Sequence, residues 1–184
     1  PALFSAIVIG FIWSSVYMPG SGMIASLLSM IGLDGGAFNP LGNYKTALYA
    51  IAIVEAWKAF GTTMIIYLAG PQTVDESLLE AGRIDGCTEW QLFRKIKLPL
   101  ISSTVTINVI LSVISGLKAF DYYFLMTNGG PCKSTKTLMF QVYETAFTDM
   151  KMGRASAFSV LAFAFIIVIT VCMLLYRNKR EVEL

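Results

Sequence analysis

Residues 80–99 read EAGRIDGCTEWQLFRKIKLP and form the longest polar interval between strongly apolar segments. The preceding run Thr73-Val74-Asp75-Glu76 has the spacing of a capping box, so we expect a short helix that continues through Ile84. Gly86 ends that helix, because glycine takes the left-handed conformation at little steric cost. Thr88-Glu89-Trp90-Gln91 repeats the capping-box spacing and predicts a second short helix.

The second predicted helix carries Trp90, Phe93 and Ile96 on one face, at intervals of three residues. Pro99 is expected to mark its boundary. Two amphipathic helices joined at a glycine do not fit inside hydrocarbon, so we expect them at the membrane surface, against the membrane or another protein. A plain surface loop is the alternative, but such a loop needs neither two caps nor two apolar faces.

This stretch resembles the EAA loop of ABC-importer permeases. In that family the loop, here residues 73–99, is a cytoplasmic coupling helix that docks into a cleft of the ATPase subunit. Gly82 stands where the pattern has a second alanine, and we expect it to loosen the first helix. The residues that the resemblance assigns to ATPase coupling are Glu80, Ala81, Asp85, Gly86, Ile96, Leu98 and Pro99.

The composition is that of a membrane protein. Of 184 residues, 55% are hydrophobic and only 14% are charged, whereas soluble domains carry about 25% charged residues. The net charge is only +2 and the basic residues form no stripe, which argues against nucleic-acid binding. Histidine is absent and the three cysteines form no CxxC pair, so we expect no metal site, disulfide framework or cofactor.

We predict an all-α, polytopic membrane helical bundle that forms a single transmembrane domain, residues 1–184. The last apolar segment has 22 residues without a charge, enough to cross a hydrocarbon core of about 30 Å. A short interfacial helix is expected at about 21–31. The chain begins at Pro1 without a basic n-region, so we interpret it as a fragment that starts in or beside a membrane helix, with no signal peptide. The predicted spans are 1–17, 46–68, 100–118 and 155–176.

The resemblance extends over nearly the whole chain. Residues 67–70 are similar to the segment before the EAA loop in sugar-type permeases, 127–131 to their external segment, and 152–157 to the entry of their last helix. Members of the family have six spans, so the resemblance implies that this chain holds the last four. It also places the EAA loop and the C-terminus in the cytoplasm, and a small excess of lysine and arginine on that side agrees.

Charged residues lie inside the second predicted span. Glu55 and Lys58 are three residues apart and share a helix face. Each charge in a membrane helix costs about 2.5–3.5 kcal/mol, so such residues face a cavity or a partner. One interpretation is an ion pair between helices. The other is a translocation cavity in which one or both groups hydrogen-bond a polyol.

The third predicted span carries small and polar residues at intervals of three or four. Small residues also allow close helix packing, so this stripe fits a packing face as well as a pore-lining face. Asn108 favours the pore, because an amide in hydrocarbon needs a partner. The resemblance places a sugar pocket between the second and third spans, with Trp57 and Phe120 able to stack on a sugar ring. The substrate-path candidates are Glu55, Trp57, Lys58, Asn108, Ser112, Gly116 and Phe120.

The chain contains no GxxxxGK[ST] sequence, so we expect ATP hydrolysis on another subunit and do not predict an enzyme. The resemblance implies a permease subunit of an ATP-driven sugar importer in the inner (cytoplasmic) membrane. Its implied partners are ATP-binding cassette ATPase subunits, a second permease in a heterodimer, an extracytoplasmic sugar-binding protein and membrane lipid. Alternatives are an ion-gradient-driven secondary carrier with Glu55 as coupling group, and a membrane scaffold or receptor subunit.

Overall fold

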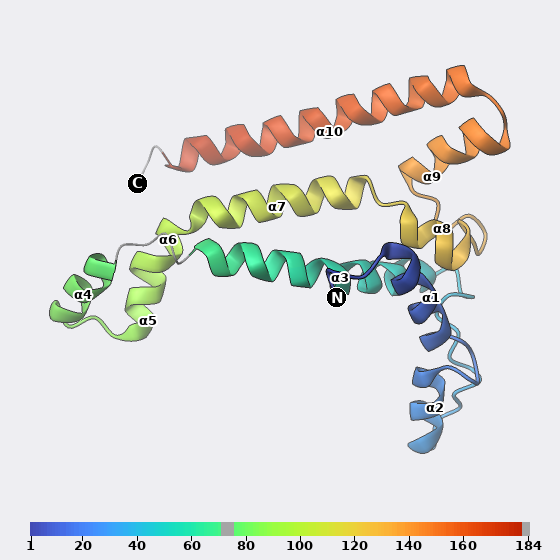
Figure 1. The fold of residues 1–184 in the computed structure, drawn as a ribbon, viewed down its shortest axis with the longest axis horizontal. Coiled ribbons are helices and arrows are strands. Elements are labelled where there is room, and N and C mark those ends of the chain that lie inside the picture. Colours follow the sequence, from blue (N-terminus) through green and yellow to red (C-terminus); the bar gives the residue numbers. More distant parts are fainter. Residues whose placement is uncertain (71–75, 182–184) are drawn as a thin grey trace.

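The computed structural model describes residues 1–70 and 76–181, and every regular element in that part of the chain is helical. The long helices α3 (Ala47–Ala69), α7 (Ser102–Leu117) and α10 (Met152–Glu181) run alongside one another (Figure 1). Helix α7 contacts both of the others. The predicted all-α architecture is confirmed.

Helices α3 and α10 are long and apolar enough to cross a membrane. The 23 residues of α3 reach about 35 Å at 1.5 Å per residue. Only 11% of the apolar window of each helix is buried inside the chain, so most of their side chains face lipid or a neighbouring protein. A bent pair, Glu89–Leu100 with Thr104–Leu117, passes the same test across a bend of 62°. The predicted spans 46–68, 100–118 and 155–176 fall on α3, α7 and α10. Helices α3 and α10 pass the test singly, whereas α7, with 16 residues, passes it only as part of the bent pair.

The first predicted span, residues 1–17, takes a different form. Helix α1 (Ala6–Val16) has 11 residues, and its length of about 16 Å is shorter than a hydrocarbon core. The Ser5 side chain caps it by accepting a hydrogen bond from a backbone amide of the first turn at 3.3 Å. This cap starts the helix five residues later than predicted. Helix α1 packs against α8 (Asp121–Thr127).

The buried core lies where α1, α3 and α8 meet. The side chains of Ile9, Ile51 and Val54 are at most 1% exposed. Tyr17, at the end of α1, donates a hydrogen bond from its hydroxyl to the Ala50 carbonyl oxygen at 3.3 Å. The core therefore holds α8 against the first half of α3, next to the charged residues of that helix.

Helix α2 (Met23–Met30) corresponds to the interfacial helix expected at 21–31. The loop that follows it turns back onto the helix at Gly35. A Cβ atom on Gly35 would lie 2.1 Å from the carbonyl oxygen of Ala25. Only glycine fits here, because the obstructing atom belongs to the backbone.

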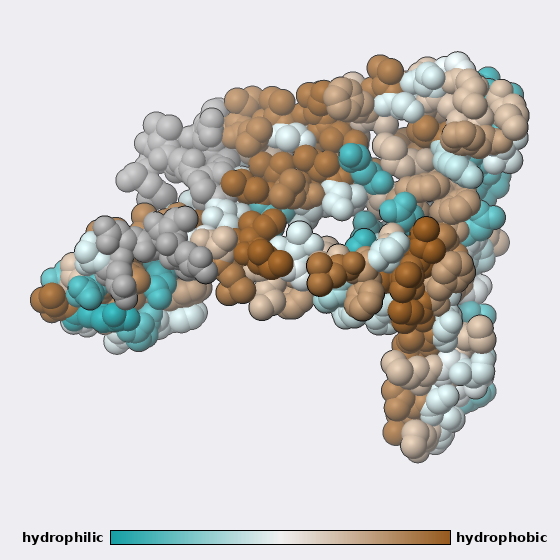
Figure 2. Space-filling view, viewed as in Figure 1, coloured by the Kyte–Doolittle hydropathy of each residue, from teal (hydrophilic) through white to brown (hydrophobic). Residues whose placement is uncertain are grey.

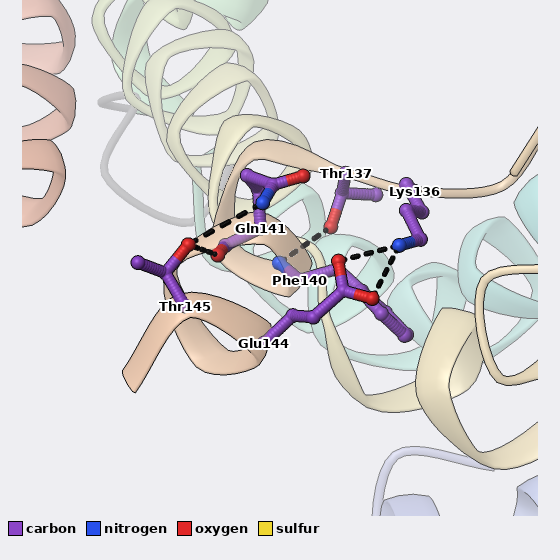
Figure 3. Close-up of polar contacts among 6 residues, drawn as sticks. All are labelled: Lys136, Thr137, Phe140, Gln141, Glu144 and Thr145. Atoms are coloured by element: carbon purple, nitrogen blue, oxygen red, sulfur yellow. Dashed lines mark hydrogen bonds and ion pairs between the residues drawn. The ribbon is translucent and has the colours of Figure 1, made fainter. Parts of the chain in front are cut away.

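The segment that connects α8 to α10 is held by local polar contacts. Asn128 ends α8 in the left-handed conformation (φ 49°), and a loop leads to α9 (Leu138–Tyr143), a π-helical turn η3 (Glu144–Thr148) and then α10. Lys136 forms an ion pair with Glu144 that closes this loop onto η3 (Figure 3). Thr137 caps α9 by accepting a hydrogen bond from the Phe140 amide at 3.2 Å. The segment is thus fixed by local contacts.

The close approach at Gly35 predicts a stability difference between two glycine substitutions. Gly35→Ala forces the loop away from α2 and should cost about 1–3 kcal/mol, as overpacking does. Gly153→Ala is the matched control, because a Cβ there meets nothing within 4 Å. Thermal unfolding of the detergent-purified protein should show a lower Tm for Gly35→Ala alone. Equal Tm values for the two variants would contradict this packing.

Candidate functional site: a hinged surface unit and a polar cavity

The stretch that opens the sequence analysis forms α4 (Glu76–Ile84), α5 (Glu89–Leu92), a π-helical turn η2 (Phe93–Lys97) and α6 (Leu98–Leu100). We call residues 76–100 the hinged unit. It lies at one end of the long helices, opposite α8 and α9 (Figure 1). Figure 2 shows hydrophilic residues gathered on the hinged unit, whereas hydrophobic residues cover much of the visible face of α7 and α10.

The turn at Gly86 that joins the two short helices has the expected local geometry on both sides. Gly86 has φ +80°, and the amide of Cys87 donates to the Gly82 carbonyl oxygen at 3.0 Å, which closes the end of α4. The capping box at α5 is confirmed: the Thr88 amide donates to Gln91 Oε1 at 2.8 Å, and the Gln91 amide donates to Thr88 Oγ1 at 3.4 Å. The predicted first capping box includes Thr73, which lies outside the described residues.

Gly82 packs the two short helices together. A Cβ on Gly82 would lie 2.6 Å from Leu92 Cδ2 and 2.9 Å from Ile96 Cδ1. Leu92 is 1% exposed. Gly82, expected to loosen α4, therefore has a second effect: its missing side chain lets α5 and η2 sit directly against α4.

Large apolar side chains remain exposed on the hinged unit. Trp90 is 67% exposed and stacks on Phe93, with ring centroids 5.8 Å apart. Ile84, beside the elbow, is 86% exposed. Ile96 is half-buried. We call Ile84, Trp90 and Phe93 the apolar ridge. The remaining residues that the resemblance assigned to coupling, namely Glu80, Ala81, Asp85, Gly86, Leu98 and Pro99, are all exposed on the same unit.

The helix boundary expected at Pro99 lies two residues later, at Ile101. Leu98 keeps helical backbone angles, and Pro99 sits near the start of α6. The turn before it widens to a π-helix, in which the Leu98 amide donates to the Phe93 carbonyl oxygen. Helix geometry breaks only at Ile101 (φ −88°, ψ 6°). Helical backbone angles are therefore kept on both sides of Pro99, directly after a π-helical turn.

A polar cavity of about 330 Å³ lies between α3 and α7. Glu55 and Lys58 line it from α3, and Asn108 and Ser112 line it from α7. A neighbouring cavity of about 280 Å³ shares Glu55 and is lined by Phe120. Five of the seven predicted substrate-path residues therefore line one of two adjoining cavities. We call the two together the α3–α7 cavity.

Two predicted residues lie elsewhere. Trp57 packs edge-on against Trp13 of α1, with ring centroids 5.6 Å apart. Gly116 is exposed, and the described residues lining the cavity do not include it. Lys58 lies one residue after Trp57, about 100° further around a helix, so the two side chains face different sides of α3.

The lining also includes residues that the sequence analysis did not select. Thr62 lies seven residues after Glu55, at a spacing that continues the same helix face. Asp121 and Tyr122 enter from α8 and Lys118 from the end of α7. No helical spacing relates α8 to α3, so only the packing of α8 against α3 reveals Asp121 and Tyr122.

The polar groups in the cavity are incompletely paired. Within the described part of the chain, no ion pair joins Glu55 to Lys58. The Lys58 ammonium lies 5.9 Å from the centre of the Tyr122 ring. Asn108 is 3% exposed, and neither its Nδ2 nor the Tyr122 hydroxyl has a hydrogen-bond partner among the described residues.

Tyr122 belongs to α8, outside the spanning helices, and keeps its proton. Burial raises the pKa of Tyr122 to about 12, and the nearby carboxylates of Asp121 and Glu55 add to this rise. Burial likewise raises the pKa of Tyr123, with the Glu55 carboxylate as a further cause. Both tyrosines are therefore neutral phenols at physiological pH. Tyr123 is hydrogen-bonded to the Glu55 carboxylate, whereas the Tyr122 hydroxyl has no hydrogen-bond partner among the described residues.

The fold and the site define a polytopic helical membrane protein with a polar cavity between α3 and α7 and an exposed apolar ridge. The family model described as "Binding-protein-dependent transport system inner membrane component" matches residues 1–179. The chain belongs to this family.

Two relatives illustrate the range of the family. AmyD of Thermoanaerobacterium thermosulfurigenes, named as a probable permease protein of a starch degradation products transport system, is 32% identical over 100% of this chain and 62% of its own length. UgpA of Brucella abortus, named as an sn-glycerol-3-phosphate transport system permease protein, is 31% identical over 98% of this chain and 61% of its own length. The chain spans about three-fifths of the length of these relatives.

Solved structures show the same fold. A chain of a bacterial ABC transporter involved in import of the acidic polysaccharide alginate matches with a TM-score of 0.86 at 22% identity, covering 97% of this chain and 62% of that one. A chain from the alginate transporter in complex with an alginate pentasaccharide-bound periplasmic protein matches with a TM-score of 0.83 at 23% identity, covering 94% and 60%.

The unpaired amide of Asn108 predicts opposite effects on stability and activity. In Asn108→Leu a similar volume replaces a buried donor that lacks a partner, so the Tm should stay the same or rise. If the amide binds substrate, uptake should fall about tenfold, since a lost hydrogen bond costs about 1.4 kcal/mol. Tm and initial uptake rate are measured on the same preparation. A lower Tm with normal uptake per folded protein would make Asn108 a structural residue.

Proposed function

We propose that the chain is part of a permease subunit of an ATP-driven sugar importer, which forms half of the translocation path and takes its energy from a separate ATPase subunit. The observation that carries this proposal is the hinged unit, whose apolar ridge is exposed at the end of the spanning helices. Exposed apolar side chains grouped on a polar surface are typical of a protein contact. The proposed occupant of this surface is the ATPase.

The attachment of the hinged unit to α3 and α7 supports this coupling role. Helix α4 follows α3 in the chain, and α6 continues into α7 through Ile101. The ends of α3 and α7 also meet beside the unit: a Cβ on Gly70 would lie 2.9 Å from Thr104 Oγ1. A displacement of the hinged unit would therefore act on α3 and α7 together, and these are the helices that line the α3–α7 cavity.

The two ends of the molecule suggest its orientation. The hinged unit and the C-terminal end of α10 lie at the same end, and α8 and α9 lie at the other (Figure 1). We place the first end in the cytoplasm and the second outside the cytoplasmic membrane, where a sugar-binding protein would deliver substrate. The solved relative that was crystallised with a periplasmic protein supports such a partner. The open faces of α3 and α10 leave room for lipid and for a second permease in a heterodimer.

Substitution of Gly86, at the turn between α4 and α5, tests the coupling role. Gly86→Val places a β-branched residue at φ +80° and should abolish transport, while the separate sugar-binding protein still binds sugar. Gly32→Val is the matched control, because Gly32 has φ +81° and equally open space around its missing Cβ but lies in the loop after α2. Uptake and sugar-stimulated ATP hydrolysis are measured in proteoliposomes. Normal uptake by Gly86→Val, or equal loss in both variants, would count against coupling through this unit.

The energy source separates the importer from an ion-driven carrier that uses Glu55. If an ATPase drives transport, uptake should stop on ATP depletion and persist when an uncoupler collapses the proton gradient. Glu55→Gln should then alter substrate affinity without changing the response to the uncoupler. Uptake that survives ATP depletion and stops with the uncoupler would reject the importer.

A further inference from the structure

An ion pair joins the two short helices of the hinged unit across the turn at Gly86. Arg83, in the last turn of α4, approaches Glu89, in the first turn of α5, with 3.0 Å between Nε and Oε1. We propose that Arg83 and Glu89 are positioning residues. Their ion pair fixes the angle between α4 and α5 and so aligns the two halves of the apolar ridge for the ATPase. This inference rests on the proposed function and names two residues on which that function depends.

Neither short helix needs this ion pair for its own formation. Helix α5 begins with the capping box at Thr88, and the Cys87 amide closes the end of α4 by donating to the Gly82 carbonyl oxygen. An arginine in a last turn and a glutamate in a first turn each interact favourably with the dipole of their own helix. Residues 85–88 separate the two helices, so the pair is not a contact within one helix. What the pair adds is a link between the helices.

A buried contact and a surface contact hold α4 against α5. Leu92, which is 1% exposed, packs at Gly82, where a Cβ would lie 2.6 Å from Leu92 Cδ2. The side chains of Arg83 and Glu89 are 51% and 71% exposed, so their ion pair lies at the surface of the unit. The buried contact alone would let α5 rotate about it. A second contact at the surface restricts that rotation and sets the angle between the helices.

The angle between the helices matters because the apolar ridge includes residues from both sides of the turn. Ile84 directly follows Arg83, and Trp90 directly follows Glu89. Ile84 is 86% exposed and Trp90 is 67% exposed, so packing within the chain does little to hold either side chain. Their relative position follows the backbones that carry them. Because the ion pair joins the residue before each of them, it sets the spacing of two ridge residues that one ATPase cleft would have to accept together.

The ion pair is expected to affect coupling more than folding. An exposed ion pair contributes little to the free energy of unfolding. A contribution of that size nevertheless changes the population of one helix angle severalfold. Removal of the pair should therefore leave the Tm almost unchanged while it lowers the rate of sugar-stimulated ATP hydrolysis. A residue with a purely structural role would instead lower the Tm and the rate together.

A double-mutant cycle on the full-length transporter complex in proteoliposomes tests the pair. Arg83→Gln and Glu89→Gln should each lower sugar-stimulated ATP hydrolysis by about two- to fivefold. The double variant should lose no more than either single variant, because the same contact is lost in all three. Arg83→Lys keeps the charge and should retain most of the rate.

The control is Lys95→Gln, which removes one charge from an exposed base of the same unit. Lys95 has no ion-pair partner among the described residues, so this variant should keep the wild-type rate. Losses that multiply in the double variant would mean that Arg83 and Glu89 act separately. That result, an unchanged rate in both single variants, an equal loss in Lys95→Gln, or a Tm that falls with the rate would each overturn the inference.

A distance measurement tests the helix angle without any transport. The full-length permease is purified without its ATPase, so that docking does not hold the helices, and its three cysteines are replaced by serine. Spin labels are attached at Leu78→Cys on α4 and at Lys95→Cys on η2, which continues α5; both positions are exposed. Double electron–electron resonance should give a narrow distance distribution, and adding Arg83→Gln should broaden or shift it. Identical distributions would overturn the inference.

These experiments separate the inference from the proposed function. Uptake that survives ATP depletion would reject the importer, whereas a distance distribution that depends on Arg83 would still show that the pair fixes the angle. ATP-driven uptake that is lost in Gly86→Val but unaffected by Arg83→Gln and Glu89→Gln would reject the inference alone.

Discussion

Hydrocarbon does not hydrogen-bond, so polar side chains on membrane helices must find partners within protein, and this constraint organises the bundle. Glu55 and Lys58 on α3, and Asn108 and Ser112 on α7, lie on the faces where the two helices approach each other. The outer faces of α3 and α10 are apolar and open. Helix α8 closes one end of the polar space by adding Asp121 and Tyr122. The cavity is therefore a consequence of where polar residues can lie in a membrane.

The hinged unit obeys a different constraint, because its helices are too short to be stable alone. Local devices stabilise them: the capping box at Thr88, the left-handed Gly86, and the contact of Leu92 with Gly82. These contacts use the inner faces of α4 and α5 and leave Trp90 and Phe93 exposed. The unit thus combines local contacts between its helices with an exposed apolar surface, which is the arrangement that the proposed contact with an ATPase requires.

Features that depend on local chemistry could be predicted from the sequence. The cap at Thr88 and the turn at Gly86 follow from spacing and from the conformational freedom of glycine. Glu55, Lys58 and Asn108 were found because a charge or an amide in an apolar helix has few acceptable surroundings, and Ser112 because it lies on a stripe of small and polar residues. The position of Trp57 could not be predicted, since an aromatic side chain fits many surroundings. The break at Ile101 could not be predicted either, since the helical backbone continues through Pro99 after a π-helical turn.

The sequence by itself determined that the chain is helical, that it belongs in a membrane, and that residues 80–99 form a capped, glycine-hinged surface element, because composition and nearest-neighbour hydrogen bonding decide these properties. Tertiary structure alone decided that α1 is a short helix packed on α8, that Gly82 brings α4 and α5 together, and that Lys118, Asp121 and Tyr122 complete the cavity. These features depend on contacts between different helices, and no periodicity within one helix encodes them.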